Sequence, residues 1–313
     1  MRLRIALEEG LEISGPVLVQ HPTLETDLST LGDFDVETPD FLVAERWGTV
    51  RPDARPYAAT LIVAPRSKEL ARDLIAKAPT DLIIVDGQKT DGIDSLWREC
   101  RKRADVQGAV TKAHGRLFWM QAQPTDFADW HYAQPEFHGF TLAPGIFSAG
   151  EIDPGSYALA EVLPAQIDGP VIDLGAGWGY LSAVAEARGA AEIDMVEINA
   201  EALACAEANT QYARGHWADA TTWRPETKAR HVIMNPPFHA DSYGGRKATP
   251  DLGRAFIANA ARCLDPKGAL WMVANRHLPY EDTLAQHFSN VTEREGPPGT
   301  RAFKLFQATR PKR

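Results

Sequence analysis

The feature that most constrains this chain is a glycine-rich turn between two apolar segments. Residues 171–181 read Val-Ile-Asp-Leu-Gly-Ala-Gly-Trp-Gly-Tyr-Leu, with glycine at the alternate positions 175, 177 and 179. The apolar run before the turn predicts a buried strand, and the small residues from Leu181 onward predict a helix. Glycines let the backbone bend sharply and leave its amides open to a bound molecule. A strand, turn and helix of this kind indicate a ligand site at the end of a parallel strand.

The spacing of this turn favours a ligand without phosphate. Dinucleotide sites prefer G-x-G-x-x-G, with the pyrophosphate on the helix N-terminus. Here Asp173 stands at the strand end, where its carboxylate would repel a pyrophosphate. We expect Asp173 to face an ammonium group, directly or through water, and Gly175, Gly177 and Gly179 to admit the ligand.

Two further acids are candidate ligand contacts. Glu197 ends the next apolar segment, where its carboxylate can accept hydrogen bonds from both hydroxyls of a ribose. The alternative for Glu197 is a surface acid at a helix start. Asp219 is the candidate acceptor for the exocyclic amine of an adenine, and a solvated turn aspartate is the alternative.

The segment Asn235-Pro236-Pro237-Phe238 follows another apolar run, His231 to Met234. Two prolines fix the chain so that the Asn235 side-chain oxygen and the Pro236 carbonyl can converge on one amine. An amine on a planar ring is a poor nucleophile, and two acceptors would stabilise the positive charge that develops on it during alkylation. Phe238 could stack on the ring. The alternative is a proline-capped loop without a chemical role.

Apolar segments and helical patterns alternate along the whole chain, which predicts an α/β fold with parallel sheets. A length of 313 residues favours two domains. The second half carries the glycine turn, and we expect its last strand, Phe303 to Ala308, to add antiparallel at the sheet edge. The first half repeats the rhythm without the turn, since residues 19–23 read Val-Gln-His-Pro-Thr. We place the domains at 1–140 and 141–313, with 124–144 as the linker.

Composition limits the function classes. The net charge is −9, with 16 basic against 22 acidic residues in 1–150 and 17 against 20 in 151–313. A nonspecific nucleic-acid coat is therefore not expected, because such binding needs clustered Lys and Arg. The sequence shows no long apolar run and no signal-peptide pattern, so we expect a cytoplasmic protein without a membrane segment. Its three cysteines lack metal-ligand spacing, so no metal is expected.

These motifs together resemble a known family. The glycine turn, Glu197 and Asn235-Pro-Pro-Phe-His239 are similar to class I methyltransferases that act on exocyclic nitrogens. More narrowly, the chain resembles the bacterial ribosomal RNA guanine-N2 methyltransferases of the small-subunit methyltransferase C type. The segments that support the narrower match are Gly145-Ile-Phe-Ser148 with Asp153-Pro-Gly-Ser156, Ala274-Asn-Arg-His-Leu-Pro-Tyr280, and Lys112-Ala-His-Gly-Arg116.

The resemblance implies two tandem Rossmann-like methyltransferase domains, the first degenerate and the second a seven-stranded class I sheet. It implies S-adenosyl-L-methionine as cofactor and ribosomal RNA or the small ribosomal subunit as partner. The first half has Asp86-Gly-Gln-Lys89 where the second has Asn235-Pro-Pro-Phe. The implied catalytic residues are Asn235, Pro236 and Phe238; the implied cofactor residues are Asp173, Gly175, Gly177, Gly179, Glu197, Asp219 and Asn235; and the candidate RNA contacts are Lys112, Arg116, His239 and Arg276.

Several alternatives stay open from the sequence. Asn-Pro-Pro with an aromatic residue also occurs in enzymes that methylate adenine N6, large-subunit guanine N2 or a release-factor glutamine. A nonenzymatic RNA-binding module for ribosome assembly is a different class of function, and the intact Asp173, Glu197 and Asn235 argue against it. A nicotinamide dehydrogenase is disfavoured by the alternate glycines and the Asn-Pro-Pro turn.

Overall fold

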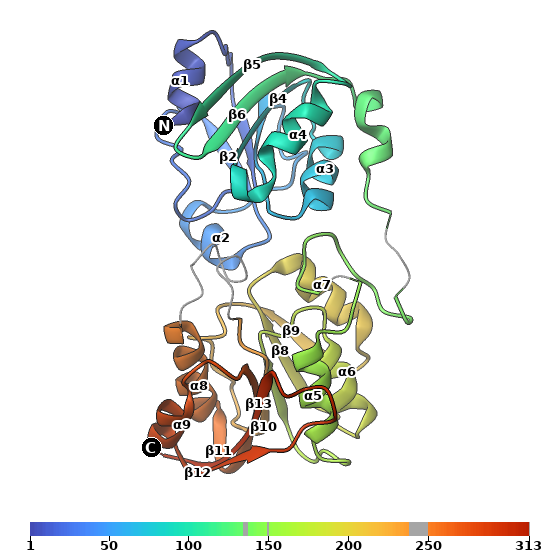
Figure 1. The fold of residues 1–313 in the computed structure, drawn as a ribbon, viewed down its shortest axis with the longest axis vertical. Helices are drawn as coiled ribbons and strands as arrows, with labels where there is room; N and C mark the ends of the chain where they lie inside the picture. Colours follow the sequence, from blue (N-terminus) through green and yellow to red (C-terminus); the bar gives the residue numbers. More distant parts are fainter. Residues whose placement is uncertain (134–136, 149, 238–249, 313) are drawn as a thin grey trace. The chain divides into compact units, whose positions relative to one another are not determined.

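A computed structural model describes residues 1–133, 137–148, 150–237 and 250–312 of the 313-residue chain. The chain divides into two compact units, Met1–Gln134 and Pro135–Arg313. This division lies six residues before the boundary expected from sequence. Each unit is built around its own sheet (Figure 1). Among the described residues, no helix is long and apolar enough to cross a membrane.

The first unit is a six-stranded mixed sheet with helices on both faces. Its strand order is β2-β1-β3-β4-β6-β5, and the pairs that involve β6 are antiparallel. Helix α3 begins after Ser67, whose side chain accepts a hydrogen bond from Leu70 N and so caps the helix. The bounds of its elements are α1 Arg2–Glu8, β1 Val17–Gln20, β2 Phe34–Glu37, α2 Phe41–Trp47, β3 Ala59–Val63, α3 Lys68–Lys77, β4 Leu82–Gln88, η1 Lys89–Asp91, α4 Ile93–Cys100, β5 Asp105–Lys112, β6 Gly115–Gln121 and η2 Pro124–Trp130.

Two apolar cores lie on opposite faces of this sheet. One contains side chains of α3, α4 and η2, and the other contains side chains of α1 and of the region around α2. Strand residues alternate between the cores, so that Ile83 and Val85 belong to one and Ile84 to the other. A sheet covered on both faces explains why β1 is buried along its whole length.

The second unit contains the glycine turn in a seven-stranded sheet. Its strand order is β12-β13-β11-β10-β7-β8-β9, with β13 antiparallel to both of its neighbours and the other pairs parallel. The bounds of its elements are α5 Pro154–Val162, β7 Val171–Leu174, α6 Tyr180–Ala187, β8 Ile193–Glu197, α7 Ala200–Asn209, β9 Ala213–Trp217, β10 Ala229–Met234, α8 Pro250–Cys263, β11 Leu264–Asn275, α9 Glu281–His287, β12 Phe288–Arg294 and β13 Phe303–Pro311.

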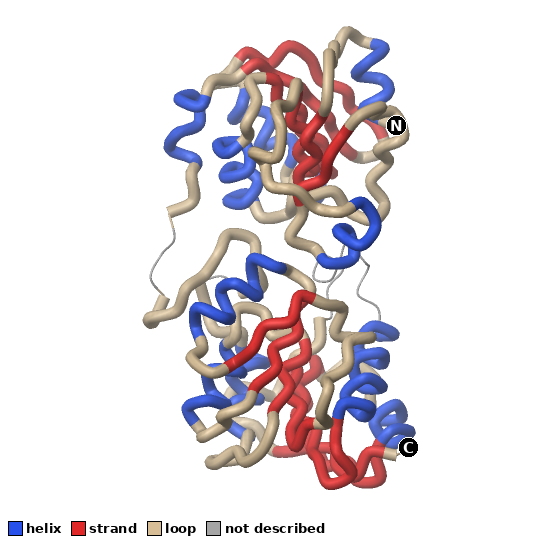
Figure 2. The backbone as a smooth tube through the Cα atoms, turned by 180° about the vertical axis from the view of Figure 1, so that it is seen from behind, coloured by secondary structure: helices blue, strands red, loops and turns tan. Residues whose placement is uncertain are grey.

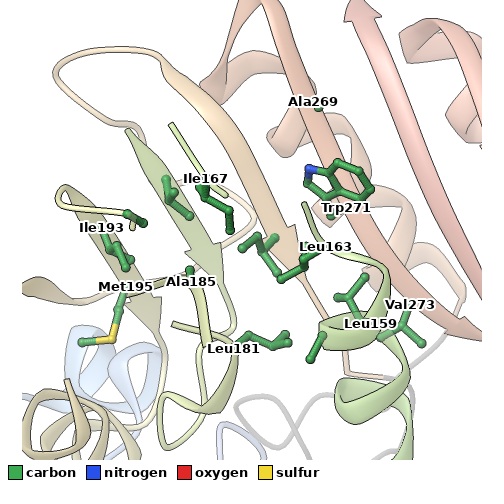
Figure 3. Close-up of a cluster of buried hydrophobic side chains, with 14 of the residues drawn as sticks. Leu159, Leu163, Ile167, Leu181, Ala185, Ile193, Met195, Ala269, Trp271 and Val273 are labelled. Atoms are coloured by element: carbon green, nitrogen blue, oxygen red, sulfur yellow. The ribbon is translucent and has the colours of Figure 1, made fainter. Parts of the chain in front are cut away.

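Helices cover both faces of the second sheet. Helices α5, α6 and α7 lie on one side and α8 and α9 on the other (Figures 1 and 2). Leu159 of α5 and Leu181 of α6 are buried against the sheet, and Figure 3 shows them beside Met195 and Val273 of its strands. Burying such side chains is worth about 1.5–3 kcal/mol each. This packing fixes the helix that follows the glycine turn.

The structure corrects one expectation about the last strand of the second unit. The strand expected at residues 303–308 is antiparallel, as expected, but it lies inside the sheet, between β11 and β12. The edge position belongs to β12, and β9 forms the other edge. Strand β12 is mostly exposed and no residue of β9 is fully buried, so their sequences lack the apolar runs that mark inner strands.

The two sheets share strand order and hydrogen-bond register. The first sheet has the order of the second without its outermost strand β9. Val17 N donates to Asp33 O and Ala58 N to Pro16 O, just as Val171 N donates to Glu192 O and Arg230 N to Pro170 O. Extending this register along the strands gives four equivalent pairs: Val19 with Asp173, His21 with Gly175, Thr38 with Glu197, and Val63 with Asn235.

This register corrects the comparison of Asp86 with Asn235. Strand β3, not β4, is the counterpart of β10, and Val63 is the residue equivalent to Asn235. Asp86 pairs with Val63 in the register of β3 and β4, which makes it equivalent to Val273 in β11. The sequence comparison matched polar residues, whereas the equivalent strand end is apolar.

Candidate active site

The glycine turn adopts a backbone that side chains would strain. Gly175, Gly177 and Gly179 have φ values of 77°, 56° and 88°, in the left-handed region. At Gly179 a Cβ would lie 2.9 Å from Ala206 Cα, so close packing of α6 on α7 also requires glycine. At Gly177 no atom lies within 4 Å of a Cβ, so the space beside this amide is open. Gly177 is therefore the position where a ligand could approach the backbone.

Glu197 holds this turn from the end of β8. Its Oε2 accepts a hydrogen bond from Gly177 N at 2.8 Å, and its Oε1 accepts one from Asn199 N at 3.0 Å. The side chain is 9% exposed. A carboxylate has about four acceptor positions, so Glu197 can accept several hydrogen bonds at once. Sequence analysis expected Glu197 at a strand end, and the contact with Gly177 joins two of the candidate residues.

Asp173 is buried beneath the turn. Ser182 Oγ of α6 donates to its Oδ2 at 2.7 Å, while its Oδ1 has no hydrogen-bond partner among the described residues. Burial raises the pKa of Asp173 to about 7, and the charge of Glu197 adds to this effect. A cation brought next to Oδ1 would favour the ionised carboxylate. The buried oxygen is thus suited to a positively charged ligand group.

Asp219 lies two residues beyond β9. Its Oδ1 accepts hydrogen bonds from Thr221 N at 2.8 Å and Thr221 Oγ1 at 2.6 Å. Ala218 N donates to Glu197 O at 3.0 Å, which brings this segment beside the end of β8. Asp219 therefore belongs to the same sheet edge as Glu197.

Asn235 follows β10 and is held by the start of α5. Its Nδ2 donates to Asp153 Oδ2 at 2.8 Å and to Ser156 Oγ at 2.9 Å. The same Asp153 oxygen accepts from Ser156 N at 2.7 Å and so caps α5. Asp153 and Ser156 were expected only as parts of a family motif, without a role. Their separation of about 80 residues from Asn235 hid the contact from sequence analysis.

One small cavity joins the glycine turn to Asn235. Gly175, Gly177 and Asn235 line it, whereas Gly179, Asp173, Glu197 and Asp219 are not among its lining residues. Its remaining walls are Phe147, Ser148, Asp153, Ser156, Ala176, Trp178, Tyr180 and Leu181. Phe147 is 46% exposed although it is a large apolar side chain. The sequence motifs contain Phe147, Trp178 and Tyr180 but gave them no part in the site, because a wall formed by two separate segments has no spacing pattern.

Three of the candidate RNA contacts can be described. Arg116 forms an ion pair with Asp94 at 2.8 Å and stacks on Trp97 with its Cζ 3.9 Å from the ring centroid. Arg276 donates to the carbonyls of Arg301 and Phe303 at 2.8 and 2.7 Å. Lys112 has an exposed side chain at the end of β5. Phe238 and His239 lie outside the described residues.

The geometry and the comparisons indicate the same class of protein. The strand order of the second unit and its glycine turn define a class I methyltransferase fold. The family model of the methyltransferase small domain matches residues 138–306. Ribosomal RNA small subunit methyltransferase C of Vibrio vulnificus is 32% identical over 270 residues, which are 80% of this chain and 76% of that protein. The protein of the same name from Shewanella oneidensis is 29% identical over 280 residues, or 83% of this chain and 79% of that one.

A solved structure extends the likeness to both units. The T. thermophilus 16S rRNA N2 methyltransferase, solved in complex with AdoMet and guanosine, matches with a TM-score of 0.74 and 23% identity. The match covers 97% of this chain and 90% of that one, so the tandem fold expected from sequence is confirmed. The chain belongs to the methyltransferase small-domain family and, within it, to the ribosomal RNA small subunit methyltransferase C group. Among the described residues, no group of three or more His, Cys, Asp or Glu side chains could hold a metal ion.

Proposed function

We propose that this chain transfers a methyl group from S-adenosyl-L-methionine to the exocyclic N2 amine of a guanine in 16S ribosomal RNA. The names of its relatives and the AdoMet and guanosine of the T. thermophilus complex support this substrate pair. The observation that carries the proposal is the cavity lined by Gly175, Gly177 and Asn235. This cavity joins the glycine turn to the side chain of Asn235, whose oxygen can accept a hydrogen bond from an amine.

The residues at the turn fit this cofactor. The orphaned Asp173 Oδ1 suits the ammonium group, and the carboxylate of Glu197 suits the ribose hydroxyls. The open space at Gly177 would admit the ligand beside the backbone. Asp219 is our candidate for the adenine amine, because its segment lies beside the end of β8. The cofactor supplies a methyl group activated by its positively charged sulfur.

Asn235 and Pro236 would act on the target amine. The Asn235 Oδ1 and the Pro236 carbonyl each accept a hydrogen bond from N2, which orients the amine and its lone pair. These bonds strengthen as positive charge develops on the nitrogen, so they lower the barrier. The guanine must be unpaired or taken out of its stack, since a cavity at a sheet edge does not reach an amine inside a helix. Phe238 is our candidate for stacking on that base.

Ribosomal RNA, free or in the small subunit, is the partner that follows from this reaction, and the cytoplasm is the compartment. Lys112, Arg116, His239 and Arg276 remain our candidates for contacts with RNA. Of the three candidates that the structure describes, Lys112 is the most accessible to RNA, because Arg116 and Arg276 already bond to neighbouring residues. Arg116 and Arg276 would need to contact phosphate while keeping those bonds.

The test compares ribosomal RNA from cells with and without the gene. We expect mass spectrometry of nuclease digests to show the loss of one N2-methylguanosine, and its return with the intact gene but not with Asn235→Ala. Purified protein with AdoMet should restore the modification in the deficient RNA or subunits. Loss of a methyladenosine, or methylation of a release-factor glutamine instead, would contradict the guanine assignment.

A further inference from the structure

The amide of Asn235 has two chemically different ends. If the site acts as proposed above, the target amine needs the oxygen end, because Oδ1 accepts a hydrogen bond whereas Nδ2 only donates. An amide turned by 180° would point its N–H groups at the N–H groups of the substrate. Something must therefore fix which end faces the cavity.

We infer that Asp153 and Ser156 are positioning residues for methyl transfer, which hold the Asn235 amide so that Oδ1 faces the target amine. This inference rests on the proposed function. Asn235 Nδ2 lies 2.8 Å from Asp153 Oδ2 and 2.9 Å from Ser156 Oγ. An ionised carboxylate accepts hydrogen bonds and donates none, so only the nitrogen end can face it. Both N–H groups of the amide are then used, and Oδ1 is left for the substrate.

The start of α5 holds these two acceptors in place. Asp153 is the N-cap, Pro154 follows in the first turn, and Ser156 N donates to Asp153 Oδ2 at 2.7 Å. Gly155 makes this close arrangement possible, because a Cβ there would lie 3.0 Å from Asp153 Oδ2 and 3.2 Å from Phe303 Cε1. Ser156 is 8% exposed. A helix cap thereby serves a second purpose as the anchor of the amide.

The charge of Asp153 adds to the effect of orientation. A hydrogen bond from Nδ2 to a carboxylate polarises the amide and makes its oxygen a better acceptor. Both effects act on turnover rather than on cofactor binding.

The test uses Asp153→Asn and Ser156→Ala in the full chain. Asparagine also caps helices, so Asp153→Asn keeps α5 but lets either end of the Asn235 amide face position 153. With saturating AdoMet and undermethylated small subunits, we expect kcat to fall about 10- to 100-fold for Asp153→Asn and about 3- to 10-fold for Ser156→Ala. KM for RNA and the cofactor Kd should stay within about twofold.

Asp126→Asn is the matched control. Asp126 Oδ2 accepts a hydrogen bond from Gln123 N at 2.8 Å in the capping box at the start of η2, in the first unit. The same substitution at this cap should leave kcat unchanged. Thermal unfolding of all variants shows whether a loss of activity reflects a loss of fold.

A double-mutant cycle with Asn235→Ala separates positioning from other roles. Once the amide is absent, Asp153→Asn should lower kcat no further, because it acts only through Asn235. Additive losses, an unchanged kcat in Asp153→Asn, or an equal loss of cofactor binding would overturn the inference. If Asn235→Ala itself keeps kcat within about twofold, the proposed mechanism fails and the inference fails with it. A large loss in Asn235→Ala with additive Asp153→Asn overturns the inference alone.

Discussion

The two units of this chain have the same sheet order and register, yet only the second has the candidate active site. Val19, His21, Thr38 and Val63 stand at the strand ends where the second unit has Asp173, Gly175, Glu197 and Asn235. Inner strands in both units are apolar and buried on both faces. The comparison teaches that packing of the strands maintains the fold in both units. The candidate site differs from the first unit at four strand-end positions, where the second unit has two carboxylates, a glycine and an amide.

His21 illustrates how the first unit changed. It has a φ of 55°, close to the 77° of the equivalent Gly175, although it carries a side chain. Burial lowers its pKa to about 4, so the imidazole is neutral at physiological pH. In the first unit no helix follows β1 before β2, whereas α6 follows the glycine turn in the second. The first unit therefore has the same left-handed backbone at this position, with a side chain in place of glycine.

The largest expected effect concerns Glu197, at the end of β8. Glu197→Ala should weaken AdoMet binding about 10- to 100-fold, the range for stranding polar partners at about 1–3 kcal/mol. Thr38→Ala, at the equivalent position of the first unit, should leave binding unchanged. Titration calorimetry on the full chain should also give one site per chain. A stoichiometry of two, or equal effects of both substitutions, would break the contrast between the units.

A smaller effect concerns pH and the buried carboxylate. Because burial raises the pKa of Asp173 to about 7, the folded protein holds this proton between about pH 4 and pH 7 while the unfolded chain has lost it. Stability from this group is therefore highest below pH 4 and falls as pH rises to 7. Asp173→Asn should remove this fall, whose part between pH 5 and pH 7 is on the order of 2 kcal/mol, and so stabilise the protein at pH 7 in the absence of cofactor.

Denaturant unfolding at pH 5 and pH 7.5 measures this difference in the free energy of unfolding. Val19, which occupies the equivalent position in the first unit, has no such dependence. If Asp173→Asn and the natural chain respond alike to pH, the carboxylate of Asp173 is already ionised in the fold and burial has not raised its pKa.

The smallest expected effect lies in the first unit. Lys112→Ala should raise KM for RNA a few-fold and lower the salt dependence of binding by about one phosphate contact, with stability unchanged. Arg116→Ala should instead lower stability by about 1 kcal/mol, because it loses the ion pair with Asp94 and the stack on Trp97. Equal salt dependence in Lys112→Ala and the natural chain would leave the first unit without this RNA contact.

Sequence reasoning reached the inner strands and the ligand turn because their signals are local. The run from Val171 to Leu174 and the three glycines after it lie within one strand and one turn. The edge strand β12 escaped prediction because five of its seven residues are exposed, so its sequence has no apolar run. The bond between Asn235 and Asp153 joins residues from separate elements, and no spacing rule reports such a contact. The placement of β13 between β11 and β12 is likewise a matter of tertiary pairing rather than of local pattern.

The strand order also determines when each sheet can be completed during synthesis of the chain. In each unit, the strand made later lies between two strands made earlier: β6 between β4 and β5, and β13 between β11 and β12. A nascent chain emerges from its N-terminal end, and its domains generally fold in that order. The first sheet is complete once Gln121 has emerged, whereas the second keeps β11 and β12 apart until Phe303–Pro311 has emerged. The first unit would thus be folded while β11 and β12 of the second unit still have unpaired edges. Unpaired strand edges can pair with other chains, so aggregation is a risk during this interval.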